Sequence, residues 1–133
     1  MGVILDTSVI IAFERGTADP DFLIRGREEE SFGICAITAA GLLHGVHLAD
    51  TSGRRIKRSS FVEKVLEKYP IYAFDLAAAR VYAELWSSLR TRKAEIGAHG
   101  LMIAATAISL GFSVATFNRR DYQKIEGLVL LPL

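Results

Sequence analysis

Short apolar runs alternate along this chain with longer segments of helical periodicity. Four runs rich in apolar and β-branched residues predict buried strands, at residues 2–5, 32–36, 71–74 and 113–116. A further run at residues 128–131 predicts an edge strand, because proline follows it directly. Strands that alternate with helices in this way predict an α/β fold, with a parallel sheet covered on both faces.

The most apolar helical segment runs from Leu101 to Leu110. It is apolar almost all round, which is typical of a helix packed against a sheet. We expect a loop over residues 95–99, then Gly100 as the N-cap of this helix and Gly111 as its C-terminal cap.

Length and composition indicate one ordered domain over residues 1–133, since half the residues are apolar. The longest apolar runs are too short or contain a charge, so we expect no membrane span. The N-terminal segment lacks the basic leader and small-residue cleavage site of a signal peptide. The single cysteine, Cys35, cannot form an internal disulfide and is expected in a core strand. Together these features predict a cytoplasmic protein.

Charge does not favour nucleic acid overall, because sixteen basic and fifteen acidic residues give a formal net charge of +1. Basic residues nevertheless cluster at residues 54–58, at residues 90–93 and at Arg119 and Arg120. Each cluster alone is typical of a solvated helix face or turn. Any RNA contact is therefore expected to be local, with Arg119, Arg120 and the cluster at residues 54–58 as candidates.

Polar side chains follow the predicted strands. Asp6 follows the first strand, while Thr116, Asn118 and Asp121 lie at or after the end of the fourth. In parallel sheets, ligands bind outside the carboxyl ends of the strands, where the strand order reverses. Carboxylates gathered there repel one another unless a hard cation such as Mg²⁺ or Mn²⁺ binds, and such a site suits phosphodiester hydrolysis. Taken alone, however, Asp6 is more typical of a plain helix cap.

Other catalytic motifs are not found in the sequence, which has neither GxxxxGK[ST] nor a GxGxxG after a strand. His44 and His47 lack a third ligand, so we expect core or surface histidines rather than a zinc site. Ser8 has no paired base and orienting acid, so we do not expect it to act as a catalytic nucleophile. A receiver-type signalling domain, with Asp75 as its phosphoacceptor, is a weaker alternative because no acidic pair follows the first strand. Asp75 is expected to cap the helix that follows it.

Four segments together resemble the motif set of PIN domains, and most closely that of the VapC-type toxins of toxin–antitoxin pairs. They are residues 3–11, 37–45, 96–107 and 116–122, in the family's order and spacing. The resemblance implies a PIN-like three-layer α/β/α sandwich with a parallel sheet of four to five strands. It also implies an Mg²⁺- or Mn²⁺-dependent endoribonuclease that forms homodimers and is inhibited by a VapB-type antitoxin covering the acidic pocket.

The same resemblance assigns roles to single residues. Asp6 is the intact acidic residue and the expected metal ligand. Asn118 and Asp121 match the last motif, where Thr116 is expected to assist.

At two positions the family's acidic residue is replaced by glycine. Gly41 stands where the family has glutamate, and Gly100 where it has aspartate. With glutamate at position 41, Thr38 and residue 41 would form a capping box. Neither glycine is expected to favour stability, unless it supplies close packing or a special backbone angle.

These substitutions support two hypotheses. The first is a VapC-like ribonuclease inactivated at Gly41 and Gly100, by deliberate substitution or natural decay, with weakened metal binding. The alternative is a non-catalytic PIN-fold module that dimerises and sequesters a VapB-type antitoxin.

Overall fold

The computed structural model describes residues 2–133 and contains one parallel sheet. Its strands are β1 (Gly2–Leu5), β2 (Ser31–Cys35), β3 (Ile71–Tyr72) and β4 (Ser113–Ala115), in the order β3-β2-β1-β4. Val3 of β1 lies opposite Phe32 of β2 on one side and Ser113 of β4 on the other. The strand order therefore reverses at β1, and the crevice that this creates lies at the carboxyl ends of β1 and β4.

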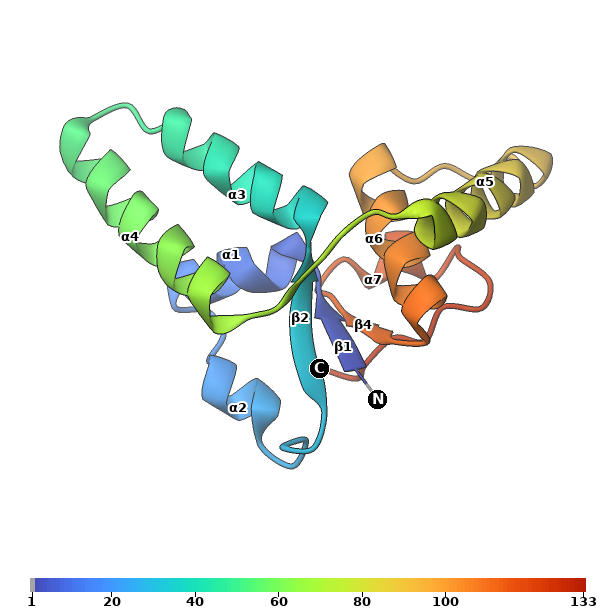
Figure 1. The fold of residues 1–133 in the computed structure, drawn as a ribbon, viewed down its shortest axis with the longest axis horizontal. Helices are drawn as coiled ribbons and strands as arrows, with labels where there is room; N and C mark the ends of the chain where they lie inside the picture. Colours follow the sequence, from blue (N-terminus) through green and yellow to red (C-terminus); the bar gives the residue numbers. More distant parts are fainter. Residues whose placement is uncertain (1) are drawn as a thin grey trace.

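Seven helices cover the two faces of the sheet within the described part of the chain (Figure 1). On one side lie α1 (Thr7–Arg15), α2 (Pro20–Ile24), α3 (Ala36–His47) and α4 (Ser52–Lys68). On the other lie α5 (Leu76–Thr91), α6 (Ala98–Leu110) and α7 (Arg119–Tyr122). This arrangement confirms the predicted three-layer α/β/α sandwich.

The central strand β1 contributes to both cores. Val3 and Leu5 pack in the apolar cluster formed with α1 to α4, whereas Ile4 packs in the cluster formed with α5 to α7. All three side chains are fully buried. This alternation is the period of two expected of a strand, and it places the end of β1 between the two helical layers.

The edge strand predicted at residues 128–131 is not formed. Residues 128–131 do not form a strand but a single parallel bridge, in which Leu130 lies opposite Val114 of β4. Pro132 follows and has no N–H group with which to extend the ladder. The sheet therefore has four strands.

The third strand is also shorter than predicted, since β3 ends at Tyr72 rather than at residue 74. Phe74 packs edge-to-face on Tyr82 of α5, at 5.7 Å between ring centroids, and so belongs to the connection into that helix. Asp75 caps α5 as predicted, because its Oδ1 accepts a 2.9 Å hydrogen bond from the N–H of Ala78.

The N-caps of two helices lie three residues before the positions expected from the sequence, which were Gly100 and, in the capping box, Thr38. α6 begins at Ala98 with Gly97 as its N-cap, so Gly100 lies in the first turn and is not the cap. α3 follows β2 without a loop, because Cys35 is both the last strand residue and the N-cap. Thr38 is therefore inside the helix, and a capping box between residues 38 and 41 is impossible. Gly111 does end α6, in the left-handed conformation at φ 72°.

Within residues 2–133, every helix is too short or too polar to span a bilayer.

Candidate active site

The site is built on the ends of the two paired strands β1 and β4. Asp6 directly follows β1 and Thr116 directly follows β4. The backbone N–H of Asp6 donates to the carbonyl of Ala115 at 2.9 Å, which holds the two strand ends together. The Thr116 hydroxyl donates a 2.7 Å hydrogen bond to Oδ2 of Asp6. The structure thus brings these two predicted site residues together at one edge of the sheet.

Three hydroxyl groups hold the Asp6 carboxylate. Besides Thr116, Ser8 donates to Oδ2 at 2.8 Å and Tyr122 donates to Oδ1 at 2.9 Å. The Asp6 residue is only 7% exposed. Hydrogen bonds to an ionised acceptor are the strong ones, so this carboxylate is stabilised by neutral donors of the chain itself.

Two of these donors, Ser8 and Tyr122, were not predicted as site residues. Ser8 lies two residues after Asp6, and Tyr122 directly follows Asp121 in the last motif segment. Burial, together with the Asp6 charge and their hydrogen bond, raises the pKa of the Tyr122 phenol. The phenol therefore stays protonated and acts as a donor.

Asn118 and Asp121 form a second polar group at the end of β4. The Asn118 N–H donates to Thr116 Oγ1 at 2.9 Å, and its side-chain amide donates to Asp121 Oδ2 at 3.0 Å. The Lys124 ammonium lies 3.4 Å from Asp121 Oδ1. The hydrogen bond from Asn118 is the largest cause that lowers the pKa of Asp121, and Lys124 adds to it. The Asp121 carboxylate thus has partners of its own.

The two predicted RNA-contacting residues, Arg119 and Arg120, begin α7 and are exposed beside this polar group. Arg119 donates to the carbonyl of Leu131 at 3.2 Å, so it also holds the C-terminal segment. No ion pair of Arg120 occurs within the described chain.

A hollow of about 390 Å³ opens above Asp6, and we call it the Asp6 hollow. Gly100 lines it, but Gly41 does not; that residue is exposed further along α3. The lining residues are Asp6, Thr7, Ser8, Ile11, Ile96, Gly97, His99, Gly100, Ile103, Asn118, Asp121 and Tyr122.

Neither unusual glycine is required by the backbone or by packing. Gly41 and Gly100 both lie inside helices and neither has a positive φ. A Cβ atom on Gly41 would meet no neighbouring atom within 4 Å. On Gly100, the nearest atoms would be at an ordinary contact distance of 3.5 Å, one of them the Tyr122 hydroxyl oxygen. Close packing and special backbone angles therefore do not explain these glycines.

The side chains present do not fit the divalent metal site that the resemblance implies. Residues 2–133 hold no group of three or more His, Cys, Asp or Glu side chains placed to share an ion. Mg²⁺ requires several oxygen ligands in octahedral geometry. The two carboxylates lining the hollow, those of Asp6 and Asp121, both already accept hydrogen bonds from protein donors.

Comparison with known proteins identifies the fold family. A profile of the PIN domain matches residues 3–128. The chain therefore belongs to the PIN domain family. It is 36% identical over 136 residues to Ribonuclease VapC1 of Rickettsia felis. This alignment covers 100% of this chain and 97% of that relative. Ribonuclease VapC of Rickettsia bellii is 33% identical over 133 residues, with 100% and 97% covered. Within its family, the chain is a VapC-type PIN domain.

Solved structures agree with the fold. VapBC2 from Rickettsia felis, bound to a DNA fragment from its promoter, matches with a TM-score of 0.89 at 23% identity and covers 98% of each chain. VapBC-5 from Mycobacterium tuberculosis matches with a TM-score of 0.76 at 27% identity, again over 98% of each chain.

Proposed function

We propose that this chain is a VapC-type endoribonuclease in which hydrolysis of RNA phosphodiester bonds is impaired by Gly41 and Gly100. The observation that carries the proposal is that both glycines lie in ordinary helical backbone with room for a Cβ atom. The family resemblance places an acidic residue at each of them. Two relatives that are named ribonucleases, at 36% and 33% identity, support RNA as the class of substrate.

The charge of the site explains the impairment. Two carboxylates line the Asp6 hollow, those of Asp6 and Asp121, and the third polar residue of the last motif, Asn118, is neutral. Asp121 is engaged by Asn118 and Lys124. This set supplies little negative charge for an Mg²⁺ or Mn²⁺ ion, so we expect weak metal binding. It also lacks the mutual repulsion of several carboxylates, so the chain folds around Asp6 without needing a cation.

Calorimetric titration with Mn²⁺ tests the proposal. The native chain is compared with a Gly41→Glu, Gly100→Asp double variant, and cleavage of RNA is measured for both. A Gly41→Gln, Gly100→Asn variant is the matched control, because it adds side chains of the same shape without charge. We expect the acidic double variant alone to gain metal affinity and cleavage. Equal affinity and equal cleavage in all three chains would refute the proposal.

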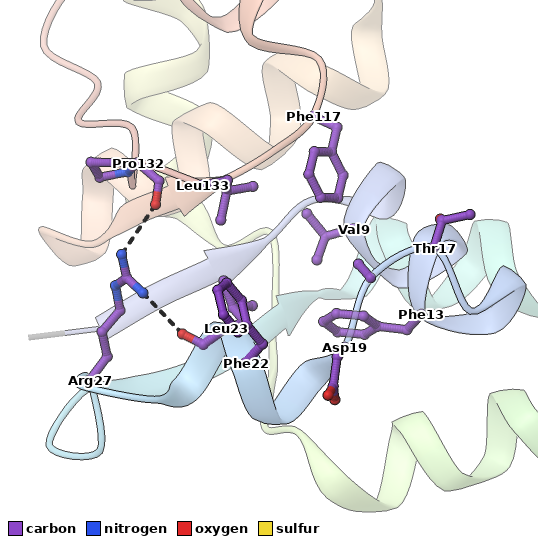
Figure 2. A pocket seen from close by; sticks show the side chains of 11 residues that line it. Val9, Phe13, Thr17, Asp19, Phe22, Leu23, Arg27, Phe117, Pro132 and Leu133 are labelled. Atoms are coloured by element: carbon purple, nitrogen blue, oxygen red, sulfur yellow. Dashed lines mark hydrogen bonds between the residues drawn. The ribbon is translucent and has the colours of Figure 1, made fainter.

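A second function, binding of a VapB-type antitoxin in the cytoplasm, is favoured by a separate feature. An apolar hollow of about 420 Å³ lies between α1, α2 and the C-terminal segment (Figure 2). Phe22 and Phe117 line it and are 69% and 54% exposed, so it presents apolar surface to a partner. Phe117 adjoins Thr116, so a partner seated there would also approach the Asp6 hollow. Solved relatives that are VapBC complexes support an antitoxin as that partner.

Co-purification tests this second function. We expect the native chain to form a stable complex with its VapB-type antitoxin and to elute as an assembly containing two copies of the chain. A Phe22→Ser, Phe117→Ser variant is expected to lose the complex, whereas Phe74→Ser, which changes an aromatic residue on the opposite side of the sheet, is expected to retain it. Retention by the first variant would exclude the apolar hollow as the antitoxin site.

A further inference from the structure

The Tyr122 hydroxyl occupies a special position in the Asp6 hollow. It donates to Oδ1 of Asp6 at 2.9 Å. The same oxygen lies 3.5 Å from the place that a Cβ atom on residue 100 would take. The hydroxyl is thus in contact with both positions from which the family resemblance expects carboxylates to share a cation.

The other carboxylate oxygen of Asp6, Oδ2, already accepts two hydrogen bonds. Oδ2 accepts from both Thr116, at 2.7 Å, and Ser8, at 2.8 Å. A carboxylate oxygen has two lone pairs, so these two donors saturate Oδ2. Oδ1 is therefore the oxygen left for any cation. Tyr122 donates to one of its two lone pairs, so a cation bound there has to share Oδ1 with the Tyr122 hydroxyl.

We propose that the Tyr122 hydroxyl is a third obstacle to metal binding, which holds Oδ1 of Asp6 in a hydrogen bond at the place where a cation shared with residue 100 would bind. This inference rests on the function proposed above. It extends that proposal, because restoring the two carboxylates then recovers only part of the metal affinity. Tyr122 acts here as a positioning residue, through Asp6.

The surroundings of Tyr122 keep its hydroxyl in place. The residue is 2% exposed and packs in the apolar cluster with Leu101, Ile103 and Ile125, so the ring cannot swing into solvent. The Cβ atom of an aspartate restored at position 100 would lie 3.5 Å from this hydroxyl oxygen, at an ordinary contact distance. The single O–H proton of Tyr122 is already donated to Asp6. The phenol would then compete with a shared cation for Oδ1 of Asp6, while its oxygen remains in contact with the start of the restored side chain.

Tyr122→Phe removes the hydroxyl and keeps the ring. The experiment measures the Kd for Mn²⁺ by calorimetry in the native chain, in Gly41→Glu, Gly100→Asp, and in that double variant with Tyr122→Phe added. We expect the triple variant to bind Mn²⁺ about tenfold or more tightly than the double variant. The reason is that Tyr122→Phe removes a hydrogen bond that stabilises the Asp6 carboxylate in the metal-free chain. Tyr69→Phe, added to the same double variant, is the control, because Tyr69 is a buried tyrosine in the other apolar cluster. It is expected to leave the Kd unchanged.

Loss of a stabilising hydrogen bond could also lower the stability of the triple variant. The rise in Tm caused by Mn²⁺ is therefore measured in each chain against its own metal-free Tm. An ion that binds only the folded state raises Tm, so this rise reports metal binding separately from the stability of the variant. A larger rise in the triple variant than in the double variant supports the role of Tyr122. If the double and triple variants bind equally, and both more tightly than the native chain, the role of Tyr122 is refuted while the function proposed above stands. If neither variant binds more tightly than the native chain, both proposals fail.

Discussion

The hydroxyl of Thr116 lies 2.7 Å from Oδ2 of Asp6 and joins the end of β4 to the end of β1. Both residues are buried, and Thr116 is completely inaccessible. The same hydroxyl oxygen accepts the N–H of Asn118 at 2.9 Å. One threonine thus fixes the acidic residue of the site and the start of the loop that carries the remaining polar residues.

Thr116→Val is expected to destabilise the chain by about 1.5–3 kcal/mol, because it removes a buried hydrogen bond to a charged acceptor and leaves the Asn118 N–H without its partner. Urea unfolding measures the change in the free energy of unfolding. Thr17→Val is the control, since the Thr17 hydroxyl bonds a carbonyl at the exposed end of α1. That change is expected to stay within about 0.5 kcal/mol. Equal effects of the two substitutions would show that the Asp6 contact contributes little.

The positions of Asp6 and Thr116 were predictable because each directly follows an apolar strand, and parallel strands end at the same edge of a sheet. Asn118 and Asp121 followed from the same reasoning. What the sequence did not indicate was the donors that surround Asp6. The contacts of Ser8 and Tyr122 depend on the rotamers of these side chains and on how Tyr122 packs against α6. Neither follows from a periodicity in the sequence.

The glycine positions show a similar limit. The identities of Gly41 and Gly100 were informative only through the family resemblance. The capping roles expected of Thr38 and Gly100 were wrong. The starts of α3 and α6 are set by Cys35 and Gly97, neither of which has a side chain that makes a capping hydrogen bond. Such starts lack the Ser, Thr, Asp or Asn signal on which the prediction depended.

Gly41→Ala and Gly100→Ala are each expected to stabilise the chain by up to about 1 kcal/mol, because alanine favours helical backbone and its methyl group has room at both positions. Thermal unfolding measures the change in Tm. Gly111→Ala and Gly33→Ala are the contrasting variants. Gly111 has φ 72°, and a Cβ on Gly33 would lie 2.5 Å from the Tyr72 ring, so both are expected to destabilise. Destabilisation by alanine at position 41 or 100 would mean that the glycine there has a structural role.

Cys35 gives a prediction for alkaline pH. Burial is the largest cause that raises the pKa of its thiol, from 9.0 to about 12. A group whose pKa is raised on folding contributes stability that is complete below its unfolded pKa and is lost as the pH rises through its folded pKa. We therefore expect the free energy of unfolding to fall as the pH rises above about 9, and to fall less steeply in Cys35→Ala.

The same burial makes the thiol unreactive, since the thiolate is the nucleophile and Cys35 is 1% exposed. Labelling with a thiol reagent at pH 8 is expected to be slow in the folded chain and immediate in denaturant. Rapid labelling without denaturant would contradict the burial of Cys35.

Arg120 tests whether RNA lies along α7. It is exposed at the start of this helix beside Asn118, and it forms no ion pair within residues 2–133. The affinity of the native chain for a single-stranded RNA oligonucleotide is measured by fluorescence anisotropy at several salt concentrations. Each phosphate contact contributes about 0.7 to the slope of log K against log salt for a single strand, so we expect Arg120→Ala to lower the slope by about that amount. Arg119 is less suitable, because its bond to the Leu131 carbonyl also holds the C-terminal segment.

The control for Arg120 is Lys64→Ala, which removes the same charge from an exposed position on α4, across the sheet from α7. A change in net charge alone would weaken RNA binding equally in the two variants, whereas a contact at α7 affects only Arg120→Ala. An unchanged slope in Arg120→Ala would place the RNA elsewhere, and the cluster at residues 54–58 would be substituted next. Because metal-assisted cleavage is expected to be weak in the native chain, the oligonucleotide stays intact during the measurement and the slope reports binding alone.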